Sequence, residues 1–587
     1  MRRALAILLF AGALAAGEAR LKHLLDPDHE DFRLQPYAWD EWETLDRETR
    51  LRARGTDPAE WTDPPPEPET EEEKKKREEA EKEEAEARAK GQFPQDRWPG
   101  FRFDELLKKR QEAFESLIQP ASASKLEGLV KQLDDLDKSL VKFDRNLEEL
   151  REKFSKVHAQ VAKAQEVYAE KYKKEHGHYP KRAPVHPSLG RVFNEASRTL
   201  QEALAKRQAQ MQFQDWLVER TARLIGELGE DEAAKPMKAI AAGLADRDWS
   251  YRVRCARLAA RIPGPAATAL LDGALEKEDD ALVRAELVRI RAGRGGEDVA
   301  AFLAARLDDA QWPVRAAAVR ALAALRTKEG VDLLVQRMAK EDGRLLDDIA
   351  EALRGATGQR FRSEPEAWKV WWSKARDTWS PPMEATGGDE PGEGQEAGVV
   401  YFYGIQSRSK RVVFCIDVSG SMGFPLDGEG GTGDPRIATA KRELNQALAA
   451  LPEDALFSSG VYNASVDTWK KRMQPATARN KEAARKFVDR LEPRGATNIF
   501  DALVTSMELA ATAKKGDDPE ADTIFFMTDG VPTNGKITDP HQILDEVTRR
   551  NASLGLVLHV VGVSREQNRG FLMNLAKRNG GRFVGYP

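Results

Sequence analysis

The sequence predicts a multidomain protein in which an α-helical coiled coil and an α-solenoid precede a C-terminal α/β domain with a doubly wound parallel sheet. Three observations support this fold class. A long heptad pattern comes first, a repeat of roughly 30 residues rich in Ala, Leu and Arg follows, and strand-like segments then alternate with helix-like ones. The 587 residues are too many for one hydrophobic core, so several domains are expected.

Residues 1–19 have the pattern of a secretory signal peptide. Met1-Arg2-Arg3 precede an apolar run from Ala4 to Ala16, and small residues follow up to Ala19. The apolar run is shorter than the ~20 residues that cross a bilayer. We therefore expect export to the periplasm, the cell envelope or the extracellular space, with no integral membrane span after cleavage. Retention of the segment as an anchor is the alternative.

Composition narrows the class of partner. The chain has 92 basic and 97 acidic residues and a net charge of −5, so no large field of one sign would attract nucleic acid. The only cysteines, Cys255 and Cys415, fall in different expected domains, and a disulfide between them is not expected. So few cysteines in an exported chain are typical of a bacterial type of protein.

Residues 20–100 are expected to be an irregular, charged, low-complexity spacer. From Pro64 to Lys90 the composition is dominated by Glu, Lys and Ala, with almost nothing apolar to bury. Such a stretch forms a solvated helix or stays disordered, and we assign it no binding role.

Residues 101–228 are expected to form a coiled-coil helical hairpin. Apolar side chains recur in alternating steps of three and four at Leu126, Leu129, Leu133, Leu136, Leu140, Phe143, Leu147, Leu150, Phe154, Val157, Val161, Ala164 and Tyr168. This spacing keeps one seam facing a partner helix. A second helix-rich segment runs from Leu189 to Leu228, so an antiparallel hairpin is preferred, and a parallel homodimer is the rival arrangement.

Residues 229–378 carry internal repeats that predict a solenoid. The recurring units align as Asp248…Val253-Arg254, Asp279…Val283-Arg284 and Asp309…Val314-Arg315, so the arginines are 30 and 31 residues apart. This pattern resembles HEAT repeats. Trp368, Trp371 and Trp372 follow at helical spacing and are interpreted as a packing cap on the last repeat.

After a flexible Pro- and Gly-rich linker at 379–400, residues 401–587 alternate between strands and helices. The expected strands are Arg411–Ile416, Ala455–Tyr462, Thr523–Met527, Leu556–Gly562 and Arg582–Val584. Asp434-Pro435 and Asp539-Pro540 each place a carboxylate before a proline, which predicts two capped helix starts. Such alternation predicts a mostly parallel sheet, covered by helices, whose ligands bind at the carboxyl ends of the strands.

Three motifs lie on the loops of this region. Asp417-Val418-Ser419-Gly420-Ser421 ends the first strand, Gly495-Ala496-Thr497-Asn498 lies further along the chain, and Thr528-Asp529-Gly530 ends a later strand. The set resembles the metal-ion-dependent adhesion site of von Willebrand factor A domains, over about 175 residues. The resemblance implies that Ser419, Ser421 and Thr497 offer hydroxyl oxygens to a metal, while Asp417 and Asp529 approach it directly or through water.

The chemistry of these side chains favours Mg²⁺, with Mn²⁺ or Ca²⁺ as possible substitutes, because every donor is a hard oxygen. Neutral hydroxyls leave the charge of the ion unquenched, so an open coordination position can attract a carboxylate from outside. The resemblance therefore implies a protein partner, or an acidic glycan, that supplies this group. The helical repeats would act as its scaffold.

Two other functions are weighed against metal-dependent binding. In a structural envelope protein, the coiled coil and solenoid would make the contacts and the metal would be incidental. An enzyme is not expected, because the sequence has no H-E-x-x-H, no G-x-S-x-G, no phosphate loop and no credible nucleophile with a base.

Overall fold

The computed structural model describes residues 103–176, 187–382, 399–426, 433–511, 519–564 and 567–586. It divides into two compact units, Met1–Pro236 and Met237–Pro587, which are treated separately below. The expected signal peptide, the charged spacer and most of the linker lie outside the described residues. None of the described helices is both long and apolar enough to cross a membrane.

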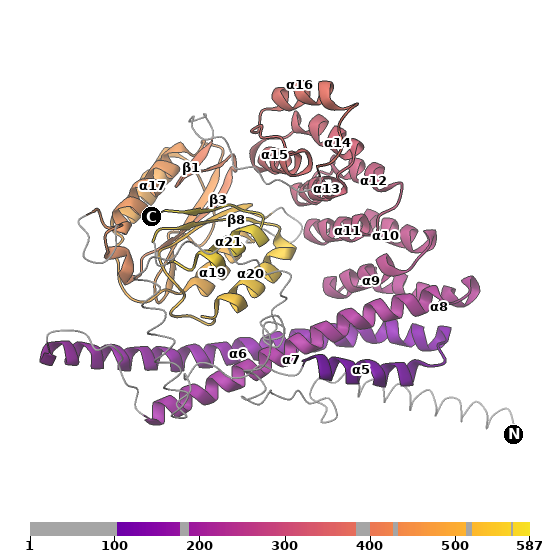
Figure 1. Ribbon diagram of the computed structural model, residues 1–587, viewed down its shortest axis with the longest axis horizontal. Helices are drawn as coiled ribbons and strands as arrows, with labels where there is room; N and C mark the ends of the chain where they lie inside the picture. Colours follow the sequence, from indigo (N-terminus) through magenta and orange to yellow (C-terminus); the bar gives the residue numbers. More distant parts are fainter. Residues whose placement is uncertain are drawn as a thin grey trace. The chain divides into compact units, whose positions relative to one another are not determined.

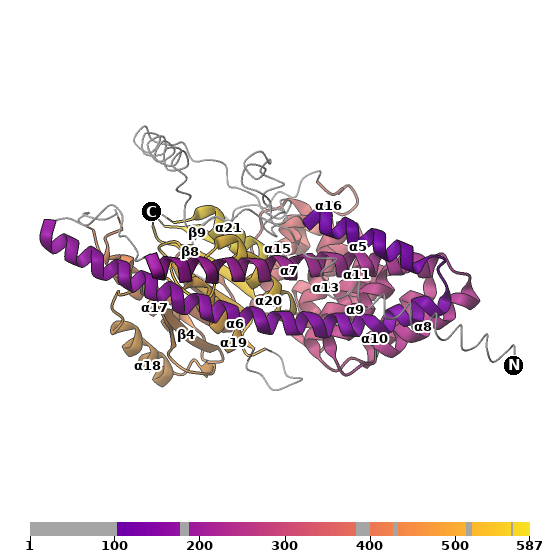
Figure 2. The ribbon, with the colours of Figure 1, turned by 90° about the horizontal axis from the view of Figure 1, so that it is seen from below.

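The first unit contains a helical hairpin with a shorter helix packed against it. The helices are α5 (Phe103–Ile118), α6 (Ala123–His176) and α7 (Pro187–Gly226). Phe154 of α6 meets Phe193 of α7 with ring centroids 5.4 Å apart, whereas Asp144 pairs with Arg207. Because earlier residues of α6 meet later residues of α7, the two helices are antiparallel (Figure 2). The structure thus has the preferred hairpin.

The solenoid consists of paired helices that stack on one another (Figure 1). Its helices are α8 (Glu230–Gly243), α9 (Trp249–Arg261), α10 (Pro265–Lys277), α11 (Ala281–Gly293), α12 (Val299–Arg306), α13 (Trp312–Leu325), α14 (Lys328–Met338), α15 (Gly343–Thr357) and α16 (Pro365–Ala375). Cys255, in α9, is fully buried. The expectation of stacked helical repeats is confirmed.

Equivalent arginines form ion pairs between successive repeats. These pairs show that the first repeat was aligned on the wrong arginine. Arg252 binds Glu278 at 2.8 Å, Arg284 binds Asp309 at 3.1 Å, and Arg315 binds Glu341 at 2.9 Å. The equivalent residue of the first repeat is therefore Arg252 and not Arg254. The sequence pattern pointed to Arg254 because it follows a valine, as the arginines of the later repeats do. In the first repeat, the equivalent valine position is occupied by Tyr251.

Helix α16 covers the last repeat with its tryptophans, as the sequence predicted. Trp368 is fully buried, and its Nε1 donates to the carbonyl of Arg362 at 2.7 Å. Trp372 donates to Asp332 of α14 at 2.6 Å, so both of these indole N–H groups have an acceptor. These bonds support a packing role for the cluster.

The α/β domain has a central sheet in the order β5-β4-β3-β7-β8-β9, with β6 beside β4. Its strands are β3 (Arg411–Asp417), β4 (Leu456–Tyr462), β5 (Val466–Thr468), β6 (Gln474–Pro475), β7 (Thr523–Thr528), β8 (Val557–Gly562) and β9 (Phe583–Gly585). The five strands expected from the sequence correspond to β3, β4, β7, β8 and β9, and the four pairings among them are all parallel. Only β5 and β6 run antiparallel to β4.

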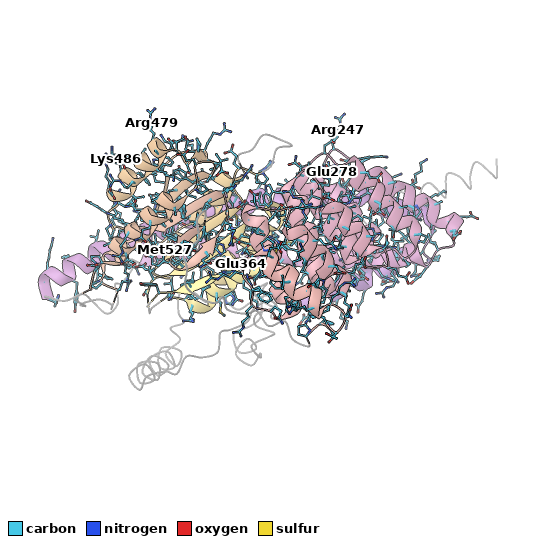
Figure 3. The ribbon with its side chains drawn as sticks, turned by 90° about the horizontal axis from the view of Figure 1, so that it is seen from above. Arg247, Glu278, Glu364, Arg479, Lys486 and Met527 are labelled. Atoms are coloured by element: carbon cyan, nitrogen blue, oxygen red, sulfur yellow. The ribbon has the colours of Figure 1, made fainter. Side chains whose placement is uncertain are left out.

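Helices cover both faces of this sheet (Figure 1). On one face, α17 (Arg436–Ala450) and α18 (Ala478–Asp489) pack on Phe414, Phe457 and Phe525, while Arg479 and Lys486 of α18 point outward (Figure 3). The opposite face holds α19 (Ile499–Ala510), α20 (Pro540–Leu554) and α21 (Arg569–Arg578). Cys415 lies there as a buried free thiol against α19, and burial raises its pKa to about 12. It is a packing residue, as expected.

A short hairpin precedes the sheet and was not predicted. Strands β1 (Val400–Phe402) and β2 (Ile405–Ser407) pair antiparallel, and Val400, Phe402 and Ile405 join the core beneath α17. The turn between them places Gly404 at a φ of +80°, which glycine adopts without strain. The sequence offered only a Gly-rich linker followed by a short apolar run here.

The solenoid contacts the amino-terminal edge of the sheet. Arg344 of α15 donates from Nη1 to the carbonyl of Asp522, just before β7, at 2.8 Å. Arg408, just before β3, pairs with Asp347 of α15 at 2.9 Å. The guanidinium of Arg320 lies near Gly555 and Gly580. The opposite edge of the sheet, where the parallel strands end, makes none of these contacts.

Candidate metal centre at the carboxyl edge of the sheet

The predicted metal ligands lie at the point where the strand order of the sheet reverses. From β3 the chain crosses to β4 on one side, and later places β7 on the other side of β3. Asp417 is the last residue of β3 and Asp529 follows the last residue of β7. In open α/β sheets this crevice outside the carboxyl ends of the strands is where ligands bind.

Backbone hydrogen bonds hold the three loops together. The N–H of Gly420 donates to the carbonyl of Gly495 at 2.9 Å, and Val418 donates to Tyr462 at 2.8 Å. A side chain on Gly420 would approach the Gly495 carbonyl at 3.4 Å, and Gly495 itself has a φ of +76°. The positive φ therefore favours glycine at 495, whereas the 3.4 Å approach at Gly420 is an ordinary van der Waals contact.

Four of the five predicted ligands form one hydrogen-bonded cluster. Ser421 Oγ donates to Asp529 Oδ1 at 2.9 Å and lies 3.2 Å from Ser419 Oγ. Asp417 Oδ1 accepts from the backbone N–H of Ser419 at 2.8 Å. Asp417, Ser419 and Asp529 are buried, which fixes their oxygens in place.

Thr497 is the fifth predicted ligand and is joined to the others through the loop backbones. Its N–H donates to Thr533 Oγ1 at 2.9 Å, and its carbonyl accepts from the N–H groups of Thr533 and Asn534. Asn498 caps α19 by accepting from the N–H of Asp501. These bonds hold Thr497 between two ordered segments, beside the Gly420–Gly495 contact.

Two residues at the site were not assigned a role from the sequence. Thr528 Oγ1 donates to Asp417 Oδ2 at 2.9 Å and so orients the second oxygen of that carboxylate. Arg436 Nη1 donates to Asp529 Oδ2, also at 2.9 Å, as a buried ion pair. The only signal for Arg436 was a basic residue directly after Asp434-Pro435.

The expected helix cap at Asp434 is wrong. The N-cap residue of α17 is Pro435, and no side chain caps this helix, whose first residue is Arg436. Pro435 instead forms an isolated antiparallel bridge with Pro425, which draws Asp434 into the loop after the first motif. The matching expectation at Asp539 is confirmed, because its side chain accepts from the N–H of Gln542.

The surroundings of Asp417 disfavour its charged form. Burial, and then the negative charge of Asp529, raise the pKa of Asp417 to about 7, although hydrogen bonds from Ser419 and Thr528 oppose this rise. Burial and the charge of Asp417 also raise the pKa of Tyr462 well above its usual range. Tyr462 therefore stays a neutral phenol, which donates to the carbonyl of Met527 at 3.0 Å.

The donor set fits a hard divalent cation. No group of three or more His, Cys, Asp or Glu side chains gathers anywhere in the described part of the chain. The site offers two carboxylates, and its other oxygens belong to hydroxyls. Oxygen donors of this kind suit Mg²⁺, Mn²⁺ or Ca²⁺, whereas zinc sites are usually built from nitrogen and sulfur. A cation between Asp417 and Asp529 would also offset their repulsion.

The rim of the site is open and partly apolar. Val531, two residues after Asp529, is 44% exposed, and Phe424, three residues after Ser421, is 37% exposed. Large apolar side chains at this level of exposure are uncommon on the described surface, and two of them flank one site.

Together, the parallel sheet and the oxygen cluster at its switch point define a doubly wound α/β domain with a candidate cation site. Residues 410–584 match the von Willebrand factor type A domain family, and residues 274–354 match HEAT repeats. The chain thus carries HEAT repeats followed by a von Willebrand factor type A domain. Both resemblances inferred from the sequence are confirmed.

Among known proteins, the chain is similar to inter-alpha-trypsin inhibitor heavy chains. It is 33% identical to heavy chain H1 of Mesocricetus auratus over 182 residues, which are 30% of this chain and 18% of that protein. It is also 33% identical to heavy chain H3 of Bos taurus over 189 residues, or 31% and 20% of the two chains. The match thus spans about a fifth of the length of these relatives.

Solved structures with a similar domain include a von Willebrand factor type A protein from Catenulispora acidiphila. It is 20% identical, with a TM-score of 0.26, and the match covers 31% of this chain and 40% of that one. Proximal thread matrix protein 1 from the mussel byssus, with a zinc-occupied MIDAS motif, is 16% identical, with a TM-score of 0.24. That match covers 32% of this chain and 44% of the mussel protein.

Proposed function

We propose that this chain is an exported binding protein whose von Willebrand factor A domain holds an acidic group of its partner through Mg²⁺. The observation that carries the proposal is the cluster of Asp417, Ser419, Ser421 and Asp529 at the carboxyl edge of the sheet. A cation held largely by neutral hydroxyls stays electrophilic. It can therefore accept a carboxylate from a protein, or from an acidic glycan, as a further ligand.

The surroundings of the cluster support binding over catalysis. Cys415 is a buried neutral thiol, and the hydroxyls of Ser419 and Ser421 bond to each other and to Asp529, with no histidine among their described hydrogen-bond partners. Val531 and Phe424 offer apolar contact area on the rim of the site. A partner side chain with a carboxylate at its tip and apolar neighbours would match this surface.

Calorimetry on the full, chelator-stripped chain tests the metal site. Mg²⁺ should bind saturably to the unaltered chain, and Ser419→Ala with Ser421→Ala should abolish the heat. Ser553→Ala, on the exposed side of α20, is the control and should bind as the unaltered chain does. A parallel Zn²⁺ titration checks the preference for the harder ion. Absence of Mg²⁺ binding would leave the domain as a structural scaffold.

Water-proton relaxation tests whether the bound ion keeps an open position. Mn²⁺ replaces Mg²⁺ because it is paramagnetic and accepts the same oxygen donors. Acetate, as a minimal carboxylate, should displace water from the protein-bound Mn²⁺ and lower the relaxation rate, whereas acetamide should not. Equal effects of acetate and acetamide would argue against recognition of a carboxylate.

A further inference from the structure

Arg436 places a buried positive charge directly beside the candidate metal site. It is the first residue of α17, its side chain is 4% exposed, and its Nη1 donates to Asp529 Oδ2 at 2.9 Å. The backbone N–H of Arg436 donates to the carbonyl of Phe424, so the loop after the first motif fixes its position. Asp529 is thereby held from two sides, by Ser421 on one oxygen and by Arg436 on the other.

The burial of Arg436 carries an energetic cost that its hydrogen bonds only partly offset. Burying a guanidinium is costly unless its donors are all satisfied. Nε of Arg436 is buried and finds no acceptor among the described residues. The pair thus pays a desolvation penalty at a position where a neutral side chain could also donate one hydrogen bond to Asp529.

A count of formal charges shows what Arg436 changes. With Asp417 and Asp529 both ionised, Arg436 cancels one of the two negative charges. A divalent ion would then leave the occupied site with one excess positive charge. Without the arginine, the same two carboxylates would neutralise the ion completely. Like charges a few ångströms apart in a buried site repel strongly.

We propose that Arg436 is a built-in counter-cation, which steadies Asp529 before metal binds and keeps the occupied site positively charged so that it attracts an anionic partner. This inference rests on the proposed function, because it assumes a divalent ion at the site. Arg436 acts through Asp529 and is a positioning residue, not a metal ligand. It weakens the binding of the metal itself and strengthens the attraction for the partner's carboxylate.

Opposite effects on stability and metal affinity distinguish this role from a merely structural one. The variants are Arg436→Gln, which removes the charge, and Arg436→Lys, which keeps it. Arg442→Gln is the control, because Arg442 lies on the same helix, is exposed and bonds only weakly to Thr439. The full chain is used throughout, with Mg²⁺ alone as the probe.

In chelator, Arg436→Gln should lower the melting temperature of the domain by about 5–10 °C, because the buried carboxylate of Asp529 loses its cation. The same variant should bind Mg²⁺ at least about tenfold more tightly in calorimetry. Arg436→Lys should stay closer to the unaltered chain in Mg²⁺ affinity, and Arg442→Gln should match it in both measurements.

Two results would overturn the proposal. If Arg436→Gln lowered Mg²⁺ affinity or left it unchanged, the arginine would have only a structural role. A melting temperature in chelator that does not fall would show that Asp529 needs no counter-cation. If the unaltered chain failed to bind Mg²⁺, both this inference and the proposed function would fall; tight binding with no effect of Arg436→Gln would remove the inference alone.

Discussion

The two edges of the central sheet carry opposite chemistry. At the carboxyl edge, Asp417, Asp529 and the serine hydroxyls form an open cluster with one counter-cation, Arg436. At the amino edge, the solenoid covers the strand ends and inserts the guanidinium groups of Arg344 and Arg320. There burial, and then the charge of Arg344, lower the pKa of Arg320 to about 10.

This difference shows how a parallel sheet can keep its contacts with the solenoid and a candidate ligand site at opposite edges. All its long strands point the same way, so one edge collects every loop that follows a strand and the other collects every loop that precedes one. A strand of this length separates the edges by roughly 20 Å. Substitutions at that distance should have independent effects.

The largest expected effect lies at the amino edge. Arg344 is 4% exposed, donates to the carbonyl of Asp522, pairs with Asp348 and stacks over Trp312 at 5.0 Å. Arg344→Ala should lower the free energy of unfolding by about 3 kcal/mol or more, because Asp348 and Asp522 lose a buried cation. Urea unfolding measures this loss. Mg²⁺ affinity should stay unchanged, and a shift in it would contradict the independence of the edges.

A pH-dependent effect of intermediate size is expected at His559 of β8. Burial, and then the charges of Arg582 and Arg344, lower the pKa of this histidine to about 3 from the usual 6.5. The unfolded chain takes up a proton below pH 6.5 that the folded chain refuses. This contribution to stability is therefore complete above pH 6.5 and is lost as the pH falls from there towards 3.

Substitution of His559 by Gln should remove this pH dependence. Between pH 7 and pH 5 the unaltered chain should lose about 2 kcal/mol more of its unfolding free energy than His559→Gln does. Glutamine can still accept the hydrogen bond that the N–H of Arg582 donates to His559. Denaturant unfolding at the two pH values gives the comparison, and parallel losses in both chains would show that His559 is not the group responsible.

The smallest effect is expected at the exposed rim of the amino edge. Asp342 pairs with Lys410 at 3.0 Å, but its side chain is 83% exposed, and Lys410 also pairs with Asp454. Asp342→Asn should change the free energy of unfolding by less than about 1 kcal/mol, because water screens the pair. A loss as large as that of Arg344→Ala would mean that charge, and not burial, holds the solenoid to the sheet.

Much of the fold could be predicted from the sequence because its signals are local. Strand and helix segments alternate along the chain, and two of the three metal-site motifs directly follow predicted strands, whereas the Gly495–Asn498 motif precedes a helix. Parallel strands bring such loops to one edge whatever the side chains elsewhere do. The heptad pattern similarly predicted the hairpin of α6 and α7, whose seam depends on spacing within each helix.

Local signals failed where a distant segment decides the outcome. Asp434-Pro435 and Asp539-Pro540 look alike in the sequence, yet only Asp539 caps its helix, because Pro435 is drawn into a bridge with Pro425. In the first repeat, Arg252 and not Arg254 forms the ion pair between repeats, since the acidic partner Glu278 lies in the next repeat. Neither result can be derived from spacing along one segment.

The sequence by itself determined the class of each domain and the oxygen donors of the candidate site, because periodicity and strand-end motifs are properties of neighbouring residues. Only the tertiary structure decided that Arg436 pairs with Asp529, that Thr528 orients Asp417, and that arginines of the solenoid cover the amino edge. These contacts join residues far apart in the chain. They depend on which side chains the fold brings together, and this cannot be derived from the residues next to them in the sequence.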